Sequence, residues 1–393
     1  MSTDKRYEFN GSMSLEVLNN YLSRAVNYSI DKTNQEQFAE DIRFLTNIGA
    51  KYVQRAGGEW LPSLKFEESY PNVKKMFELA HEKDPDIIFE AAVFECITED
   101  ITTIPIPAWV FEAFGLPAEE RNFSAKNCYF LDKWGKDKHG EKMHAPDVTR
   151  IETQMFFYYK ACKYISIGYE ALHMGQTLMT GKNDTNFECW TKVITLIREY
   201  AKKHARRGYV IINSHDHGKL KHCETGHYLV DLIMAPMRAH APEGSVDHFP
   251  TEDNPQRCIV EKGYWNDSPY QAGYSGTTPC GEYTDKYPYM VEFDNYGNGK
   301  PGEPGVADSY VWGLDENGWY SNQPQWYRKE FTHYLLDTID SFEENGHVAL
   351  LGHRGGYYSL IEKKGIPFYA NSTEYMPTGY NDEGWLKELL ESR

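Results

Sequence analysis

Residues 187–218 read FECWTKVITLIREYAKKHARRGYVIINSHDHG, and this stretch decides the fold class. Its first part has apolar residues at helical spacing, which predicts a helix over 187–204. A short run rich in β-branched residues follows at 209–213 and ends in the polar sequence NSHDHG. A helix that leads at once into a short apolar strand is typical of parallel sheets covered by helices.

The same alternation continues on both sides of this stretch. Further apolar runs predict strands at 11–15, 51–56, 87–94, 164–171, 228–235, 289–294 and 348–352. Helices are predicted between them at 35–48, 73–82, 148–163 and 325–344. Eight strands that alternate with helices over about 340 residues favour an α/β fold of the (β/α)8 barrel type over an open doubly wound sheet.

The chain of 393 residues shows no repeat and no linker, so we expect residues 1–393 to form a single barrel domain. Two long segments interrupt the alternation: 98–146, which is dotted with proline, and 240–286, which is rich in aromatic residues, glycine and proline. Loops of this length in compact domains are usually functional, so both are expected as insertions over the C-terminal face of the barrel. Residues 258–264, CIVEKGY, leave open a ninth strand within the second insertion.

Acidic residues dominate the charge. The 58 Asp and Glu residues against 41 Lys and Arg residues give a formal net charge of −17. Such a surface repels a phosphate backbone, so nucleic acid is not expected as a partner. The basic residues Lys202, Lys203, Arg206 and Arg207 are interpreted as one solvated helix face. No window approaches about 18 apolar residues, so no membrane span is expected.

The cysteines indicate a reducing compartment. Seven cysteines are scattered without a CxxC pair, which neither a disulfide framework nor a structural zinc site predicts. The first residues, MSTDKRYEFNGS, lack the apolar core of a signal peptide. We therefore expect free thiols and a cytoplasmic location.

Polar residues that close the predicted strands are the candidates for chemistry, because catalytic groups of (β/α)8 barrels stand at the carboxyl ends of the strands. Two of the carboxylates, Glu170 and Glu292, fall on the fourth and seventh predicted strands. Cleavage of a glycosidic bond needs two carboxyl groups, one to protonate the leaving oxygen and one to attack or to activate water. Strand alternation favours Glu292 over Asp294, which remains the alternative. Each carboxylate has a structural alternative, as a buried ion pair or a loop cap.

This placement resembles the retaining glycoside hydrolases of the large (β/α)8 clan that carries a catalytic glutamate on strands four and seven. The resemblance covers the barrel topology and two short segments, and it implies that Glu170 is the acid/base and Glu292 the nucleophile. Members of the clan usually have Asn before the acid/base, where this chain has Tyr169. Retention implies carboxyl groups about 5 to 5.5 Å apart, against roughly 6.5 to 9.5 Å for inversion.

The aromatic content also suits a carbohydrate ligand. The chain contains 29 Tyr, 19 Phe and 9 Trp, and aromatic faces pack against sugar rings while polar groups bond the hydroxyls. The residues expected to bind the substrate are Arg55, Trp60, Glu95, His173, His215, Asp216, Tyr270, Asp294, Asn295 and Arg354. No cofactor is expected, since GxGxxG and P-loop sequences do not occur.

Two other functions remain open. The spacing of His215 and His217 around Asp216 is compatible with a metal-dependent hydrolase, although no metal ligand set is predicted. The third possibility is a barrel that binds carbohydrate without cleaving it.

Overall fold

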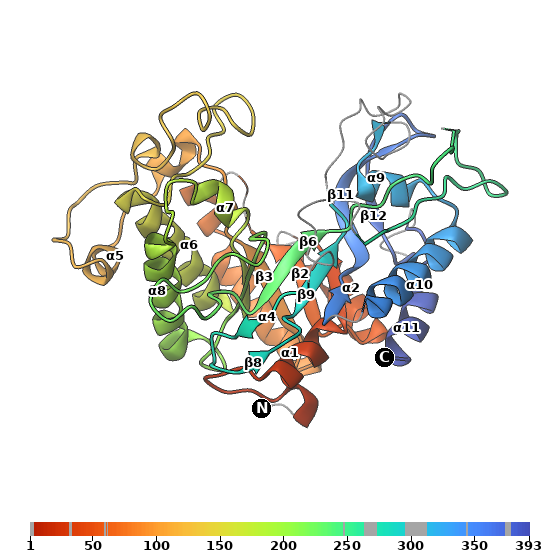
Figure 1. The fold of residues 1–393 in the computed structure, drawn as a ribbon, viewed down its shortest axis with the longest axis horizontal. Helices are drawn as coiled ribbons and strands as arrows, with labels where there is room; N and C mark the ends of the chain where they lie inside the picture. The colour runs from red at the N-terminus through yellow and green to blue at the C-terminus, as the bar shows by residue number, and fades with distance from the viewer. Residues whose placement is uncertain are drawn as a thin grey trace. The chain divides into compact units, whose positions relative to one another are not determined.

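The computed structural model describes residues 4–30, 34–58, 60, 62–246, 248–262, 273–294, 313–342, 345–373 and 379–393 (Figure 1). The chain forms two compact units. Unit 1 comprises Met1–Leu18, Arg55–Ile233 and Ser275–Asp285, and unit 2 comprises Asn19–Gln54, Met234–Tyr274 and Lys286–Arg393.

The main sheet has ten strands in the order β10-β9-β6-β5-β4-β3-β2-β1-β11-β12. Their bounds are β1 Ala25–Tyr28, β2 Tyr52–Gly57, β3 Ile88–Ala92, β4 Ala171–His173, β5 Ile211–Ser214, β6 Leu232–Pro236, β9 Tyr289–Glu292, β10 Gly346–Val348, β11 Leu350–Ser359 and β12 Lys364–Tyr369. Only Ala349 separates β10 from β11, so together they form the eighth strand. The eight strands then follow the cyclic order of a (β/α)8 barrel, which confirms the predicted fold class.

Unit 1 contains β3, β4 and β5, together with the end of β2 and the start of β6. These parallel strands pair in register, with Ala92 opposite His173 and His173 opposite Asn213. The helices of the unit are α3 Leu64–Glu67, α4 Tyr70–Lys83, α5 Ala108–Ala113, α6 Ile151–Ile167, α7 Thr177–Thr180 and α8 Glu188–His204, with 3-10 turns η1 Lys5–Tyr7, η2 Glu99–Thr103 and η3 Ala125–Asn127. Helices α6 and α8 lie side by side (Figure 1), and Trp190 stacks on Phe157 between them.

Unit 2 contains β1, β9, β10, β11 and β12, with the start of β2 and the end of β6. Asn27 of β1 pairs with Gln54 of β2, and Val291 of β9 pairs with Val348 of β10. The helices are α2 Gln35–Ile48, α9 Glu316–Ser321, α10 Gln325–Ser341 and α11 Glu383–Glu391, while α1 Leu15–Leu22 runs across the boundary of the units. Arg43 of α2 bonds Glu383 of α11 at 2.7 Å, which holds these two helices together.

Two of the eight predicted strands are wrong. Residues 11–15 lead into α1, and the first strand is instead β1, whose central Asn27 interrupts the apolar pattern. Residues 164–167 form the end of α6, which stops where Gly168 takes a left-handed conformation with φ 110°, and β4 begins only at Ala171. Aromatic and β-branched residues in the last turn of a long helix imitate a strand in the sequence, because both elements bury them. The five predicted helices are present as α2, α4, α6, α8 and α10.

The long segments have structure of their own. In 98–146, Trp109 of α5 contacts Tyr158 and Tyr159 of α6 and Tyr200 of α8, and the ring of His139 meets Trp60, which follows β2, edge-on with centroids 5.3 Å apart. In 240–286 the described residues form an isolated bridge between His240 and Ile259, and a small hairpin of β7 Gly276–Thr277 and β8 Tyr283–Thr284. Within the described chain, no helix is long and apolar enough to cross a membrane.

Replacing Gly58 by alanine tests the close approach of β2 to β3. A Cβ at Gly58 would lie 2.5 Å from the carbonyl oxygen and 2.7 Å from the nitrogen of Ala92, and its φ is +117°. Gly115 also has a positive φ, +70°, but a Cβ there meets nothing within 4 Å. We expect Gly58→Ala to lose about 1 to 3 kcal/mol more unfolding free energy than Gly115→Ala in urea denaturation. Equal losses would contradict the contact.

Candidate active site

A buried polar network joins the strands of unit 1. Glu90 of β3 is fully buried, and its carboxylate accepts the side-chain N–H of Asn213 at 2.6 Å and the backbone N–H of Arg55 at 3.1 Å. The Oδ1 of Asn213 lies 2.6 Å from Nδ1 of His173. Because Asn213 presents an acceptor there, His173 donates through Nδ1. Glu90, Asn213 and His173 therefore hold one another in fixed orientations across β3, β4 and β5.

His215 and Asp216 follow β5 directly. The His215 ring meets the His173 ring edge-on, with centroids 5.0 Å apart. Asp216 is fully buried; one oxygen accepts the N–H of Leu220 at 3.0 Å, and Oδ1 has no partner among the described residues. Burial raises the pKa of Asp216 to about 6. This carboxyl group can therefore hold a proton close to neutral pH.

Arg55, Trp60 and Glu95 lie around Phe94. The Trp60 ring contacts Phe94 edge-on at 5.2 Å, and the Arg55 guanidinium lies 5.8 Å from the Phe94 centroid. Glu95 is buried, and its Oε2 finds no hydrogen-bond partner in the described part of the chain. That oxygen packs so closely on Gly175 that a Cβ there would come within 2.1 Å of it.

Four residues near the carboxyl ends of barrel strands adopt left-handed backbone conformations although they are not glycine. They are Arg55, Phe94, His217 and Arg238, with φ between 50° and 62°. Such conformations cost free energy for residues with a Cβ and are common at functional sites. Arg55 lies within β2, two residues before its end, and the other three follow β3, β5 and β6.

Glu170 lies at the opposite end of its strand from the predicted position. It precedes Ala171, the first residue of β4, so it stands at the amino end of this strand. Its carboxylate accepts hydrogen bonds from Arg206 at 2.7 Å and Arg207 at 2.7 Å. Burial opposes its ionisation, but the charges of Arg207 and Arg206 outweigh it and lower the pKa of Glu170. The structure thus shows a buried ion pair, and the arginines are not on a solvated helix face as predicted.

Glu292 of unit 2 is at the carboxyl end of β9, as predicted. It is 3% exposed, and its Oε2 accepts a short hydrogen bond from the side-chain amide of Gln54. Gln54 pairs with Asn27 on the neighbouring strand. The Oε1 of Gln54 and both polar side-chain atoms of Asn27 are buried without a partner among the residues described. Buried amides with unused hydrogen-bonding groups are unusual and favour a ligand or ordered water nearby.

Asp294 is held differently from Glu292. Its carboxylate bonds Arg238 at 3.2 Å, and its N–H donates to Glu316 at 2.8 Å. Glu316, fully buried at the start of α9, also accepts the N–H of Ala239 at 3.2 Å. Arg354 of β11 donates to the Tyr357 hydroxyl at 3.3 Å. The carboxylate of Asp294 is thus paired with Arg238.

The predicted residues fall into three groups. Arg55, Trp60, Glu95, His173, His215 and Asp216 lie in unit 1 at carboxyl strand ends, Glu292, Asp294 and Arg354 lie in unit 2, and Tyr270 and Asn295 lie outside the described residues. Sequence reasoning did not select Glu90, Asn213, Gln54 or Asn27. A single polar residue within an otherwise apolar run, as in IIFEAAV, is the signal that marks them.

A metal centre is not apparent in the described residues, where no group of three or more His, Cys, Asp and Glu side chains is placed to hold an ion. His215 packs on His173, and His217 has a left-handed backbone with φ 50°. Nothing in this arrangement favours the metal-dependent alternative.

No protein-family model and no curated protein matches this chain. Among solved structures, it is similar to the debranching enzyme of Nostoc punctiforme (11% identity, TM-score 0.44, 94% of this chain and 77% of that chain). The chain is also similar to the β-L-arabinopyranosidase of Geobacillus stearothermophilus (8% identity, TM-score 0.40, 95% of this chain and 78% of that chain). A third similar structure is the α-galactosidase of Thermus thermophilus (12% identity, TM-score 0.33, 56% of this chain and 44% of that chain). All three names denote enzymes that act on carbohydrates. The fold assignment rests on the strand order and register given above.

Glu170→Gln tests the ion pair. Removing one partner of a buried pair leaves the arginines uncompensated, so we expect a loss of about 3 to 5 kcal/mol in unfolding free energy at pH 7. Because the pKa of Glu170 is lowered by folding, its stabilisation is present above the ordinary glutamate pKa of about 4.3 and is lost as pH falls below it. The difference in unfolding free energy between the wild type and Glu170→Gln should therefore shrink below about pH 4.

The matched control is Glu199→Gln, which removes an exposed carboxylate paired with Lys202. Exposed pairs contribute at most about 1 kcal/mol. Equal stability losses for the two variants in chemical denaturation would show that the pairing of Glu170 is not structural.

Proposed function

We propose that the protein hydrolyses a glycosidic bond in an oligosaccharide or glycoside by a two-carboxylate, retaining mechanism, with Glu292 as nucleophile. The observation that carries this proposal is the position of Glu292 at the carboxyl end of the seventh barrel strand. It is buried there, and Gln54 orients its carboxylate by a hydrogen bond. A nucleophile in glycoside cleavage must be ionised and held in one direction toward the anomeric carbon.

Within unit 1, Asp216 replaces Glu170 as the candidate for a proton-donating carboxyl group. Protonation of the leaving oxygen requires a carboxylic acid that keeps its proton near neutral pH. Burial raises the pKa of Asp216 to about 6, whereas the pKa of Glu170 is lowered by its arginines. Asp216 also follows the carboxyl end of a strand, where barrel enzymes place catalytic groups.

Substrate contacts are assigned within each unit. In unit 1, Trp60 offers an aromatic face, and His173 and His215 offer ring nitrogens to hydroxyl groups. In unit 2, the guanidinium of Arg354 on β11 is the polar group assigned to substrate hydroxyls. These contacts suit a sugar, which combines apolar C–H faces with a rim of hydroxyls.

Glu292→Gln and Asp216→Asn test the catalytic assignments on a panel of nitrophenyl glycosides and the matching disaccharides. We expect Glu292→Gln to lower kcat about 10³-fold or more on both kinds of substrate. Asp216→Asn should lose about 10² to 10⁴-fold on disaccharides and far less on nitrophenyl glycosides, whose leaving group needs little protonation. Asp294→Asn is the control and should retain turnover. If Asp294→Asn is inactive while Glu292→Gln remains active, Asp294 is the nucleophile in place of Glu292.

The pH profile provides an independent test of Asp216. A general acid works only when protonated, so kcat/KM of the wild type should fall as pH rises above about 6. This alkaline limb should be absent from Asp216→Asn. A limb that persists unchanged in the variant assigns the acid to another group.

Proton NMR of the first-formed sugar decides the stereochemistry. Retention of the anomeric configuration is expected with Glu292 as nucleophile, and an inverted product would make it the base that activates water. Saturable binding of a sugar whose bond is never cleaved would instead identify a carbohydrate-binding barrel without activity.

A further inference from the structure

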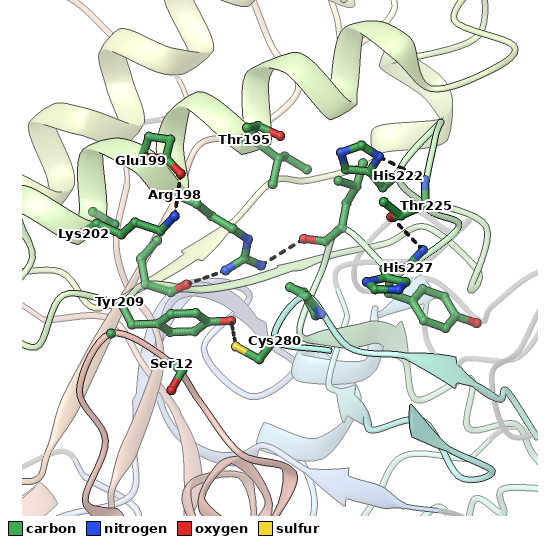
Figure 2. Close-up of a pocket in the computed structure, with 17 residues that line it drawn as sticks. Ser12, Thr195, Arg198, Glu199, Lys202, Tyr209, His222, Thr225, His227 and Cys280 are labelled. Atoms are coloured by element: carbon green, nitrogen blue, oxygen red, sulfur yellow. Dashed lines mark hydrogen bonds and ion pairs between the residues drawn. The ribbon is translucent and has the colours of Figure 1, made fainter. Parts of the chain in front are cut away.

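The connection from β5 to β6, residues 215–231, is fully described and contains no helix. A (β/α)8 barrel ordinarily has a helix after each strand. Beside this connection, within unit 1, lies a pocket of about 390 Å³. Figure 2 shows Thr195, Glu199 and Lys202 of α8 on one side of it and His222, Thr225 and His227 on the other.

The floor of the pocket is apolar and rigidly held. Ile194, Val210 and Leu229 line it, together with Tyr209. Arg198 donates to the carbonyl oxygens of Val210 at 3.2 Å and Leu229 at 2.9 Å, and thus ties α8 to the chain on either side of β5. The Tyr209 hydroxyl bonds Asp231 and lies 3.3 Å from Sγ of Cys280. The cavity is therefore preformed.

The rim of the pocket carries hydrogen-bond donors. His222 accepts the backbone N–H groups of Glu224 at 3.2 Å and Thr225 at 3.4 Å through Nδ1, so its Nε2 carries the proton and can donate. Lys202 adds a cation. Glu199 is the one carboxylate among the described lining residues, and Lys202 already bonds it at 2.5 Å. The rim is thus complementary to an anion.

The composition of the pocket selects the ligand class. Its volume is in the range of small-molecule sites. Its described lining includes no Asn, Asp, Gln or Trp, and its Arg198 already bonds Val210, Leu229 and Asp231. We propose that this pocket binds a small organic anion, with an apolar body over Ile194, Leu229 and Tyr209 and a carboxylate or phosphate head toward Lys202 and His222. The site is separate from the proposed catalytic residues.

Calorimetry with benzoate, phenyl phosphate and the neutral analogue benzamide tests the proposal on the full chain. We expect one saturable site for at least one of the two anions. The anion that binds more tightly shows whether the site prefers a carboxylate or a phosphate head group. Benzamide should bind at least about fivefold more weakly, since it lacks the charge. Equal binding of all three compounds, or no binding of either anion at millimolar concentration, would overturn the proposal.

Charge variants on one helix locate the site. Lys202→Met should weaken anion binding by about fivefold, and Glu199→Gln should strengthen it by a similar factor, because it removes the competing carboxylate. Lys203→Met, an exposed neighbour that does not line the pocket, should leave the affinity unchanged. Equal effects of the two lysine variants would mean that only the general charge of the helix matters.

Cysteine alkylation reports occupancy directly. Cys280 lines the pocket, whereas the exposed Cys223 does not. Bound anion should slow the reaction of Cys280 with iodoacetamide, measured by mass spectrometry, and leave that of Cys223 unchanged. Saturating anion without selective protection of Cys280 would place the ligand elsewhere. This readout is independent of glycosidase activity, so either proposal can fail alone.

Discussion

Unit 1 depends on the pairing of one buried carboxylate, that of Glu170, with Arg206 and Arg207. An unpaired carboxylate costs several kcal/mol to remove from water, so the chain can bury Glu170 before β4 only with both arginines beside it. Arg207 also lies 3.8 Å over the ring of Phe9 and donates to the carbonyl oxygen of Tyr7 at 3.3 Å. The same interaction therefore fixes the N-terminal segment on the unit.

Buried polar side chains near the strand ends differ in how completely they are hydrogen-bonded. At the amino end of β4, both carboxylate oxygens of Glu170 accept hydrogen bonds from arginines. At the carboxyl ends, atoms of Asp216 and Glu95 in unit 1, and of Asn27 in unit 2, have no partner among the described residues. Native proteins rarely leave buried polar atoms unpaired without a functional reason. Asp86 Oδ1, just before β3, also has no partner among the described residues, so the difference lies between individual side chains and not between the two ends of the strands.

The sequence predicted the long elements well, because α2, α8 and α10 repeat their apolar residues over several turns. It failed at β4, which has only three residues and follows α6 closely. That single misplacement moved Glu170 from one end of a strand to the other. Pairing with Arg206 and Arg207 is not visible in the sequence, since it depends on a contact across 36 residues. Glu292 was placed correctly because β9 matches its apolar run.

The left-handed residues at the strand ends have a consequence for engineering. Glycine adopts this conformation without steric cost, whereas Arg55, Phe94, His217 and Arg238 each give up about 1 to 2 kcal/mol to keep a side chain there. Their summed strain is comparable with a sizeable part of the net stability of a typical domain. Selection for thermal stability alone would therefore favour glycine at these four positions first. The protein would become more stable, but it would lose the side chains that these positions now carry.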